Sequence, residues 1–526
     1  MIEIFRRHPA LGFILTGLLA FFASALLQSS GNFPDPDSFY HARMALLIRD
    51  QGIIRDFPWL TQTVFADSYV DHHFLYHLLL IPFVSLPDPL LGMRISAVVF
   101  GVSAMVGAAL LLRSFGVAGA AFSTLALAAS NPFLFRMNLA KTPSLSLLMV
   151  FLGLWAAFKS KPLILAAIAF AYVWLYDGWP ILLVVVASYI LAEAIVSRSP
   201  RALVSRRNLA LSGGVVLGII TGHVINPYFP ENIPFEWLHI VRVGIIGFRD
   251  QFGVGQEWYP WKPQELLASS SLTFILLLSS ALFGLVASLI RSRYPVERER
   301  LVMAVALGIL VVVACVFTLK AKRNVEYFVP FAVLFAFSAI DCARRKVGSL
   351  WFQEMVGALK GWRRAAAIIV AAFFALTTPL LAARDVLAAK RDFESGIPPD
   401  KYEKLSAWLQ TNTSKGSIIF HNDWDDFPYF FIRNTHNRYL VGLDPAFMFV
   451  KNPERFREWV ETTQGRDLNF LGARIYERFG AEYAFVDRDH QPLEAALSRD
   501  PLMRLVYSDE EGKIYQFVPP PGFVAR

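Results

Sequence analysis

Asp35-Pro-Asp-Ser-Phe-Tyr-His41 is the stretch from which the interpretation of this 526-residue chain starts. It directly follows the first apolar segment, so its two carboxylates lie at a predicted membrane–water boundary. A carboxylate near hydrocarbon is costly unless it binds something, which makes this cluster a functional-site hypothesis. Carboxylate oxygens suit Mg²⁺ or Mn²⁺. The alternative is a solvated turn formed by Pro34 and Pro36, with Asp37 capping a helix that starts near Phe39.

The composition predicts a polytopic membrane protein. Hydrophobic residues make up 55% of the chain and charged residues 17%, whereas soluble domains are about a quarter charged. The net charge is +8, but the basic residues lie in short clusters between apolar segments, which is a topology pattern and predicts no nucleic-acid partner. The basic N-terminus has no convincing cleavage site before Asp35, so the first apolar run is predicted to be an uncleaved helix.

Membrane spans are predicted from runs of about 20 mostly apolar residues. Eleven such segments occur, at 9–28, 92–112, 116–131, 143–158, 162–176, 179–197, 208–226, 271–290, 301–319, 325–341 and 365–384. The apolar stretch 73–87 is shorter and bounded by proline, so it is predicted to be an interfacial or re-entrant helix.

The positive-inside rule orients these spans. With the N-terminus in the cytoplasm, the basic clusters at 6–7, 159–161, 198–207 and 291–300 all fall in cytoplasmic loops. We therefore expect a multi-pass protein of the cell inner (plasma) membrane. Its long outer loops are 29–91 and 227–270, and everything after residue 385 is extracytoplasmic or periplasmic.

Two domains are predicted. Residues 1–390 form a polytopic α-helical membrane domain of about 11 spans plus the interfacial helix. From about residue 390 charged residues become frequent and the apolar runs shorten to strand length. Residues 391–526 are therefore predicted to be a small extracytoplasmic α/β domain.

The loop 320–324 carries Lys320, Lys322 and Arg323 on the outer side, where basic residues are disfavoured. Binding of an anionic head group is one physical reason for such a cluster. Snorkelling of basic residues at helix ends is the alternative.

This architecture resembles the GT-C class of membrane glycosyltransferases, and within it the catalytic subunit of oligosaccharyltransferases. Asp37-Ser-Phe-Tyr-His-Ala-Arg43 is similar to the family's Asp-x-aromatic-Tyr-His-x-Arg motif after the first helix. Val254-Gly-Gln-Glu257 resembles its short motif ending in Glu, and Lys322-Arg-Asn-Val-Glu326 resembles the start of a late helix whose Arg meets the donor phosphate. Asn422-Asp-Trp-Asp-Asp-Phe427 stands where the family has Trp-Trp-Asp-Tyr-Gly.

The chain departs from the family pattern in two places. Only Trp424 and Asp425 match the last motif, so reading of a Ser/Thr sequon is not implied. In the loop 135–143 the family has an acidic motif, whereas this chain has Arg136 and Lys141 and no carboxylate. The resemblance is therefore to a divergent relative with different metal ligation or an altered reaction.

The resemblance implies an enzyme that moves a sugar or oligosaccharide from a polyprenyl-(pyro)phosphate donor to an extracytoplasmic protein, lipid or polysaccharide, with membrane lipids as further partners. It implies Mg²⁺ or Mn²⁺ as cofactor. The implied roles are metal binding and catalysis by Asp37 and Glu257, with Asp35 as a helper or base; donor-phosphate binding by Arg323, Lys322 and Lys320; and acceptor contacts by Trp424 and Asp425. His72 and His73 follow Asp71 in the first outer loop and are further candidate metal ligands, although packing at the interface is the alternative.

Two other functions stay open. The altered loop at 136–143 also fits a catalytically silent protein that binds lipid-linked glycans or assists their assembly. A transporter or flippase is expected to carry ionisable residues or broken helices near the membrane midplane, and the predicted spans contain few such features.

Overall fold

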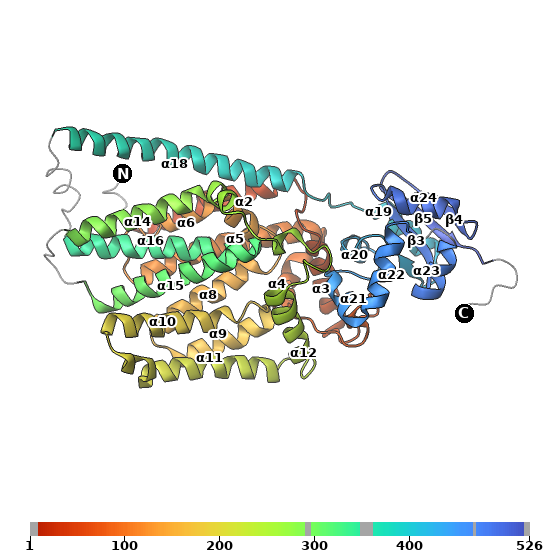
Figure 1. Cartoon of the computed structure of the whole chain (residues 1–526), viewed down its shortest axis with the longest axis horizontal. Helices are drawn as coiled ribbons and strands as arrows, with labels where there is room; N and C mark the ends of the chain where they lie inside the picture. The colour runs from red at the N-terminus through yellow and green to blue at the C-terminus, as the bar shows by residue number, and fades with distance from the viewer. Residues whose placement is uncertain (1–8, 290–295, 348–360, 467–469, 520–526) are drawn as a thin grey trace. The chain divides into compact units, whose positions relative to one another are not determined.

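The computed structural model describes residues 9–289, 296–347, 361–466 and 470–519 (Figure 1). Two compact units are built from segments far apart in the sequence. Unit 1 comprises 1–32, 94–225 and 256–396, and unit 2 comprises 33–93, 226–255 and 397–526. One division lies close to the predicted boundary at residue 390, but most of the first long loop and part of the second group with the C-terminal segment.

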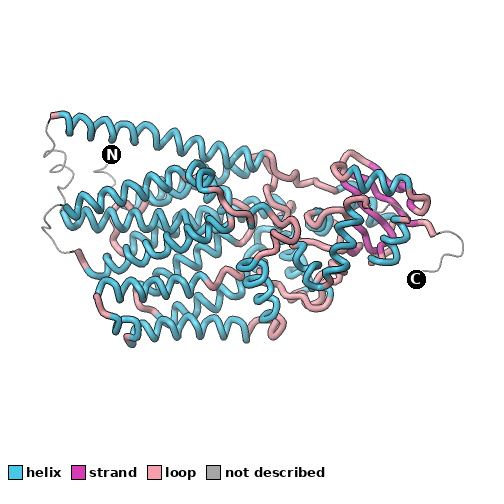
Figure 2. The backbone as a smooth tube through the Cα atoms, viewed as in Figure 1, coloured by secondary structure: helices cyan, strands magenta, loops and turns pink. Residues whose placement is uncertain are grey.

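Unit 1 is a bundle of helices, drawn as cyan tubes in Figure 2. They are α2 (Pro9–Gln28), most of α5 (Pro89–Ser114), α6 (Phe122–Ala128), α7 (Asn131–Met137), α8 (Pro143–Phe158), α9 (Pro162–Leu175), α10 (Ile181–Ser197), α11 (Arg206–Val224), α13 (Pro263–Ser269), α14 (Ser271–Leu289), α15 (Arg298–Lys320), α16 (Val325–Val347) and α18 (Trp362–Glu394).

Within the described ranges, four helices are long and apolar enough to cross a membrane: Ala10–Gln28, Pro89–Ser114, Arg298–Lys320 and Lys322–Val347. The pair Pro263–Ser269 and Ser271–Leu285, bent by 88°, adds a fifth if it is one span. The total of eleven spans stays a prediction. Residue 290 of the predicted span 271–290 and residues 291–295 of the basic loop lie outside the described residues.

The predicted span 116–131 is replaced by two short helices, α6 and α7. Ser130 between them is extended, with φ −105° and ψ 106°, and Pro132 is in the first turn of α7. A proline fits the first turn of a helix but not its interior, where it removes a hydrogen bond and clashes with the preceding turn, so Ser130-Asn-Pro132 starts a new helix and interrupts the apolar run. This break is important for the site because Arg136 lies in the last turn of α7.

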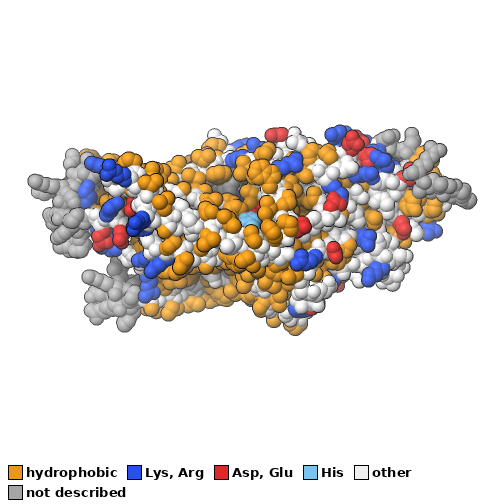
Figure 3. All heavy atoms as spheres, turned by 90° about the horizontal axis from the view of Figure 1, so that it is seen from below, with side chains coloured by type: hydrophobic (Ala, Val, Ile, Leu, Met, Phe, Trp, Pro, Cys, Tyr) orange, Lys and Arg blue, Asp and Glu red, His pale blue; other side chains and the backbone are white. Residues whose placement is uncertain are grey.

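The bundle presents apolar side chains outward, as lipid contact requires. Ile14 and Phe22 of α2, Leu217 of α11 and Val312 of α15 are each more than half exposed. Figure 3 shows hydrophobic side chains forming broad continuous areas on the face drawn there. Soluble monomers rarely expose such areas, so this surface fits an integral membrane protein.

Helix α11 packs against α9 through glycines spaced four residues apart. A Cβ at Gly218 would lie 2.1 Å from the backbone oxygen of Ala166, and one at Gly214 would lie 2.5 Å from that of Pro162. Small residues at this spacing allow two membrane helices to meet backbone to backbone.

We expect Gly218→Leu to separate α9 from α11 and to lower the melting temperature of the full-length protein in detergent. Overpacking of this kind costs about 1–3 kcal/mol. Gly213→Leu is the matched control, because a Cβ at Gly213 meets nothing within 4 Å and leucine has the higher helix propensity. Equal melting temperatures for the two variants would contradict the close helix contact.

Unit 2 contains the predicted α/β fold. Its five-stranded sheet has the order β2-β1-β3-β5-β4. Strand β1 (Ile418–Phe420) is parallel to both β2 (Arg438–Tyr439) and the central strand β3 (Ala481–Asp487). Strand β5 (Gly512–Phe517) is antiparallel to both β3 and β4 (Met503–Ser508).

Helices of unit 2 surround this sheet and its apolar core. They include α19 (Glu403–Asn412), α20 (Asp426–Phe431), α21 (Pro445–Lys451), α22 (Pro453–Thr463), α23 (Leu471–Phe479) and α24 (Gln491–Arg499). Phe420, Trp459, Ile475 and Val486 are among the buried core residues.

The first long loop is docked on this sheet and contributes α3 (Asp37–Gln51) and α4 (Phe74–Val84). The N–H of Tyr439 in β2 donates to the carbonyl of Trp59 at 2.7 Å, and the N–H of Thr61 donates to the carbonyl of Tyr439 at 2.9 Å. The loop therefore continues the sheet beyond β2. Helix α4 has 11 residues, about 16 Å at 1.5 Å per residue, which is too short to cross a bilayer and agrees with the interfacial assignment.

Candidate active site

Five buried or half-buried polar side chains of unit 1 come together at the predicted outer end of the bundle. Arg136 lies in α7 and Tyr176 lies between α9 and α10. Glu257 is in the short helix η4 (Gln256–Trp258), Arg323 is in η5 (Lys322–Asn324), and Glu326 is in the first turn of α16. Segments more than 100 residues apart in sequence therefore meet around two guanidinium groups.

Arg136 is at the centre of this cluster. Its Nη1 lies 2.6 Å from Glu257 Oε2, and its Nε lies 2.8 Å from Glu326 Oε2. The side chain of Arg136 is 8% exposed and that of Glu326 is 3% exposed. Buried charges persist only when paired and hydrogen-bonded, and here each of these two satisfies the other.

Arg323 reaches the opposite side of the same carboxylate. Its Nη1 lies 3.3 Å from Glu257 Oε1, and its Nη2 donates to the hydroxyl of Tyr176. The guanidinium lies over the ring of Trp258, 4.3 Å from its centroid, so cation–π attraction adds to the ion pair. Both oxygens of Glu257 are therefore held by arginines.

A backbone hydrogen bond and a side-chain hydrogen bond hold η5 against the segment after Glu257. The N–H of Lys322 donates to the carbonyl of Tyr259 at 2.9 Å, and Trp261 Nε1 donates to the carbonyl of Lys322 at 3.3 Å. The Lys322 ammonium lies 5.4 Å from the Trp261 ring centroid, whereas Lys320 is exposed at the end of α15. Of the three predicted phosphate-binding residues, Arg323 forms an ion pair with Glu257.

Glu257 is a strong acid in this setting. Burial opposes its ionised form, but the positive charges of Arg323, Arg136 and Lys141 outweigh burial and hold its pKa well below the usual range. A carboxylate whose two oxygens are engaged by guanidiniums does not fit a divalent cation, because the cation would add charge to a site already rich in positive charge. The predicted Mg²⁺ or Mn²⁺ then depends on Asp37 and the histidines of the first long loop.

Asp35 and Asp37 lie in unit 2, at the N-terminus of α3. Asp37 is the first residue of the helix, and its N–H donates to Asp35 Oδ1 at 2.9 Å. The alternative to a metal site was a solvated turn in which the Asp37 side chain caps α3. At this turn the Asp35 carboxylate accepts a hydrogen bond from the Asp37 N–H. The helix dipole favours both carboxylates at this end.

A buried chain of hydrogen bonds joins α3 to α4 within unit 2. Asp71 Oδ2 lies 2.7 Å from His77 Nδ1, and His77 Nε2 lies 2.8 Å from His41 Nδ1. With Asp71 ionised and His77 neutral, His77 Nδ1 donates a hydrogen bond to Asp71, and His77 Nε2 accepts one from His41 Nδ1. This order leaves His41 Nε2 as an electron-pair donor.

The candidate ligands His72 and His73 stand beside this chain. The His72 ring centroid lies 4.9 Å from that of His239, and the His73 centroid lies 4.9 Å from that of His41. Burial, with neighbouring histidines adding to it, holds the pKa of His73 well below its usual range, so this imidazole is neutral, the form that binds metals. Their role as ligands stays a prediction.

Trp424 and Asp425 form the connection between β1 and α20 in unit 2. Trp424 packs half-buried against the core, and the Asp425 N–H donates to Asp423 Oδ1 at 3.3 Å. Asp426, which the sequence analysis did not single out, is the buried carboxyl here. It accepts from the Tyr402 hydroxyl at 3.0 Å and from the Asp423 N–H at 3.1 Å. Burial raises the pKa of Asp426 well above its usual range, and repulsion by the negative charges of Asp423 and Asp487 raises it further.

This raised pKa predicts a pH-dependent stability. The folded state binds the Asp426 proton more tightly than the unfolded state, whose Asp pKa is about 3.9. The stability contributed by this proton is therefore present below about pH 4 and is lost as pH rises toward the folded pKa. We expect Asp426→Asn to melt like the wild type at pH 4 and at a higher temperature than the wild type at pH 7–8.

Asp489→Asn is the control for this measurement, because Asp489 follows β3 at the same edge of the sheet as Asp426 but is exposed. It should keep the wild-type dependence of melting temperature on pH. An Asp426→Asn variant with the wild-type slope would show that the buried carboxyl does not carry the proton.

Several members of these clusters carry no role that the sequence predicts. Arg136 lies in a loop that lacks the family's carboxylate, and Glu326 belongs to the motif after Arg323 without a role of its own. Glu326 lies within an apolar predicted span, where a carboxylate indicates a buried partner, so this signal was present. His77 lies four residues after His73, and nothing in the sequence linked either of them to His41.

Three solved structures show what the whole chain is similar to. The archaeal oligosaccharyltransferase AglB from Archaeoglobus fulgidus, in complex with an inhibitory peptide and a dolichol-phosphate, matches 98% of this chain and 75% of its own with TM-score 0.62 and 13% identity. ArnT from Cupriavidus metallidurans, bound to undecaprenyl phosphate, matches 96% of this chain and 97% of its own with TM-score 0.57 and 15% identity. Arabinofuranosyltransferase AftD from Mycobacteria matches 97% of this chain and 40% of its own with TM-score 0.53 and 12% identity.

These proteins are GT-C glycosyltransferases, so the chain has the GT-C fold that its motifs indicated. No protein-family model matches the sequence, and the comparison with curated proteins gives no match. The low identities agree with a divergent relative. Together with its apolar helices, the fold makes this an integral membrane protein.

Proposed function

We propose that this protein is a membrane glycosyltransferase that takes a sugar or oligosaccharide from a polyprenyl-(pyro)phosphate donor and transfers it to an extracytoplasmic acceptor. The observation that carries the proposal is the pair Arg136 and Arg323, buried on two sides of Glu257 within a GT-C fold. Two similar structures were determined with dolichol-phosphate and undecaprenyl phosphate, which supports a phosphate-bearing lipid as the ligand.

The chemistry of the cluster suits a phosphate. Guanidinium groups bind carboxylates and phosphates through the same planar fork of N–H donors, and Glu257 already lies between two of them. The short helix η5, which contains Arg323, directly precedes α16, whose N-terminus adds partial positive charge. Fixed cations in a water-poor site stabilise negative charge on a leaving phosphate without reorganisation.

Glu257 and Glu326 orient these cations in the proposal. Glu326 holds Arg136 at Nε, so the guanidinium cannot turn away from Glu257. The lowered pKa of Glu257 makes it a weak proton acceptor. We therefore assign Glu257 to positioning, with Asp37 as the predicted catalytic carboxylate and metal ligand. A bound Mg²⁺ or Mn²⁺ would neutralise charge on the donor phosphate.

The acceptor side is assigned to the segment at Trp424 and Asp425. Two of the five residues of the family motif are present there, which supports an acceptor-facing role without supporting sequon recognition. A protein, a lipid and a polysaccharide are all retained as acceptor classes. ArnT and the arabinofuranosyltransferase AftD have the same fold but are not named as oligosaccharyltransferases. The fold alone is therefore compatible with each of the three acceptor classes.

Binding of undecaprenyl phosphate to the purified full-length protein tests the phosphate site. We expect Arg323→Gln to weaken binding at least about tenfold in native mass spectrometry, because a charge-assisted hydrogen bond and an ion pair are lost. Lys262→Gln is the matched control, since Lys262 is exposed and pairs with Glu265. Unchanged binding in Arg323→Gln, with its melting temperature preserved, would refute the site.

Turnover tests the reaction itself. We expect the wild type to release sugar from a polyprenyl-phosphate donor in proteoliposomes, and Asp37→Ala to abolish release while the protein remains folded. Full activity of Asp37→Ala would overturn the assignment of the catalytic carboxylate. Tight binding of undecaprenyl phosphate by a wild type that turns over no donor would instead favour the catalytically silent, glycan-binding alternative.

A further inference from the structure

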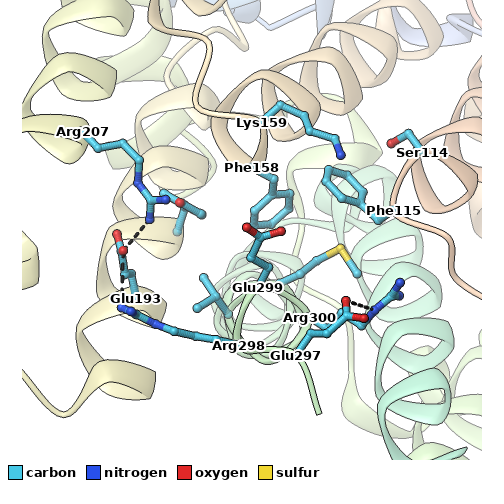
Figure 4. Close-up of a pocket in the computed structure, with 13 residues that line it drawn as sticks. Ser114, Phe115, Phe158, Lys159, Glu193, Arg207, Glu297, Arg298, Glu299 and Arg300 are labelled. Atoms are coloured by element: carbon cyan, nitrogen blue, oxygen red, sulfur yellow. Dashed lines mark hydrogen bonds and ion pairs between the residues drawn. The ribbon is translucent and has the colours of Figure 1, made fainter. Parts of the chain in front are cut away.

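A second charged cavity lies within unit 1, at its predicted cytoplasmic end (Figure 4). Its volume is about 430 Å³, within the range of sites for small ligands. It is enclosed by the residues that follow α5 and α8, by α10, and by the first turns of α11 and α15. None of these residues belongs to the Arg136 cluster, so the cavity needs an explanation of its own.

One wall of the cavity is a row of aromatic rings. Phe158 is at the centre, with its ring centroid 5.6 Å from that of Phe115 and 5.4 Å from that of Tyr189. The row ends in cations: the Lys159 ammonium lies 4.7 Å from the Phe115 centroid, and the Arg207 guanidinium lies 5.5 Å from the Tyr189 centroid. The wall is thus apolar but carries positive charge at both ends.

Most charges around the cavity neutralise one another. Arg207 pairs with Glu193, and Arg298 lies 3.6 Å from the same carboxylate. Arg300 pairs with Glu297 at 2.9 Å and with Asp341 at 3.1 Å. The Arg300–Glu297 pair lies at the N-terminus of α15 and the others join neighbouring helices; together they account for three of the four basic side chains that line the cavity.

Two further charged groups line the cavity outside these ion pairs, and one of them, Glu299, attracts Arg207 without pairing with it. Among the residues that the structure describes, neither Lys159 nor Glu299 forms an ion pair, and both line the same cavity. In Figure 4 the Glu299 carboxylate points into the cavity toward the aromatic wall, and the Lys159 ammonium lies above Phe115. No ion pair joins Lys159 to Glu299 among the described residues, so the ammonium nitrogen and the carboxylate oxygens are more than 4.0 Å apart. A ligand placed between them can contact both groups.

We propose that this cavity binds a zwitterionic head group, with its phosphate at Lys159 and its primary ammonium at Glu299. The ligand class is the ethanolamine phospholipid. A primary ammonium donates three hydrogen bonds to a carboxylate, whereas a trimethylammonium group donates none. An anionic glycerol head group has no cation for Glu299.

A membrane lipid suits the position of the cavity. It opens at the ends of apolar helices, and Val302 and Met303 of α15 add apolar lining next to the charged groups. The predicted cytoplasmic basic clusters place this end at the inner leaflet. The inference does not depend on glycosyl transfer, because no residue of the proposed phosphate site takes part.

Lipid binding to the full-length protein in detergent tests the proposal. The probes are short-chain phosphatidylethanolamine, phosphatidylcholine and phosphatidylglycerol with the same acyl chains, read out by native mass spectrometry. We expect the ethanolamine lipid to bind at least about tenfold more tightly than the other two. Glu299→Gln should abolish this preference, and Lys159→Gln should weaken binding of the ethanolamine and choline lipids.

Lys161→Gln and Glu265→Gln are the matched controls, since both side chains are exposed and neither lines the cavity. They should bind like the wild type, and all four variants should keep the wild-type melting temperature. Equal binding of the three lipids by the wild type, or full preference retained in Glu299→Gln, would overturn the proposal.

Soluble glycerophosphoethanolamine distinguishes the source of the ligand. Much weaker binding than that of the lipid would assign the site to the membrane. Binding as tight as that of the lipid, and equally sensitive to Lys159→Gln and Glu299→Gln, would support the zwitterion site and assign it to a soluble molecule.

Discussion

The pairing of Arg136 with Glu326 is the interaction on which the rest of the candidate site depends. Neither charge is tolerated alone at this depth, because removal of one partner leaves an uncompensated buried ion. The pair holds α7 against the first turn of α16 and thereby fixes where the Nη atoms of Arg136 lie. Glu257 forms an ion pair with the Arg136 Nη1 held in this way, and Arg323 forms an ion pair with Glu257. Four segments of unit 1 are thus ordered by one buried guanidinium.

Unit 2 is organised by a comparable constraint on polar groups. The edge strand β2 has backbone groups that need partners, and the segment at Trp59 to Thr61 supplies them. The Asp71–His77–His41 chain then joins α3 to α4 in the same loop. A loop of this length is ordered because its backbone and its buried side chains are paired with the C-terminal sheet and with one another.

Hydropathy and charge were sufficient to predict most of the helical part, since lipid contact demands long apolar runs and basic residues mark one side. They failed at 116–131, where Ser130 and Pro132 broke an apolar run that composition alone could not distinguish from a span. Arg323 was predicted to be a functional residue because it breaks the positive-inside rule. Its partners were not, because pairing of Arg136 with Glu257 and Glu326 depends on helix packing between distant segments. The contact between His77 and His41 could not be predicted for the same reason.

The position of Glu257 has a consequence for any anion that enters the cluster. A phosphate at Arg323 must share or replace the contact to Glu257 Oε1, which at 3.3 Å is the longer of the two ion pairs. The shorter contact at 2.6 Å, between Glu257 Oε2 and Arg136, is backed by Glu326 and resists replacement. An incoming anion should therefore engage Arg323 while Arg136 keeps Glu257 in place. The carboxylate then remains beside the phosphate as a fixed negative charge, which limits how tightly the anion is held and favours its release after reaction.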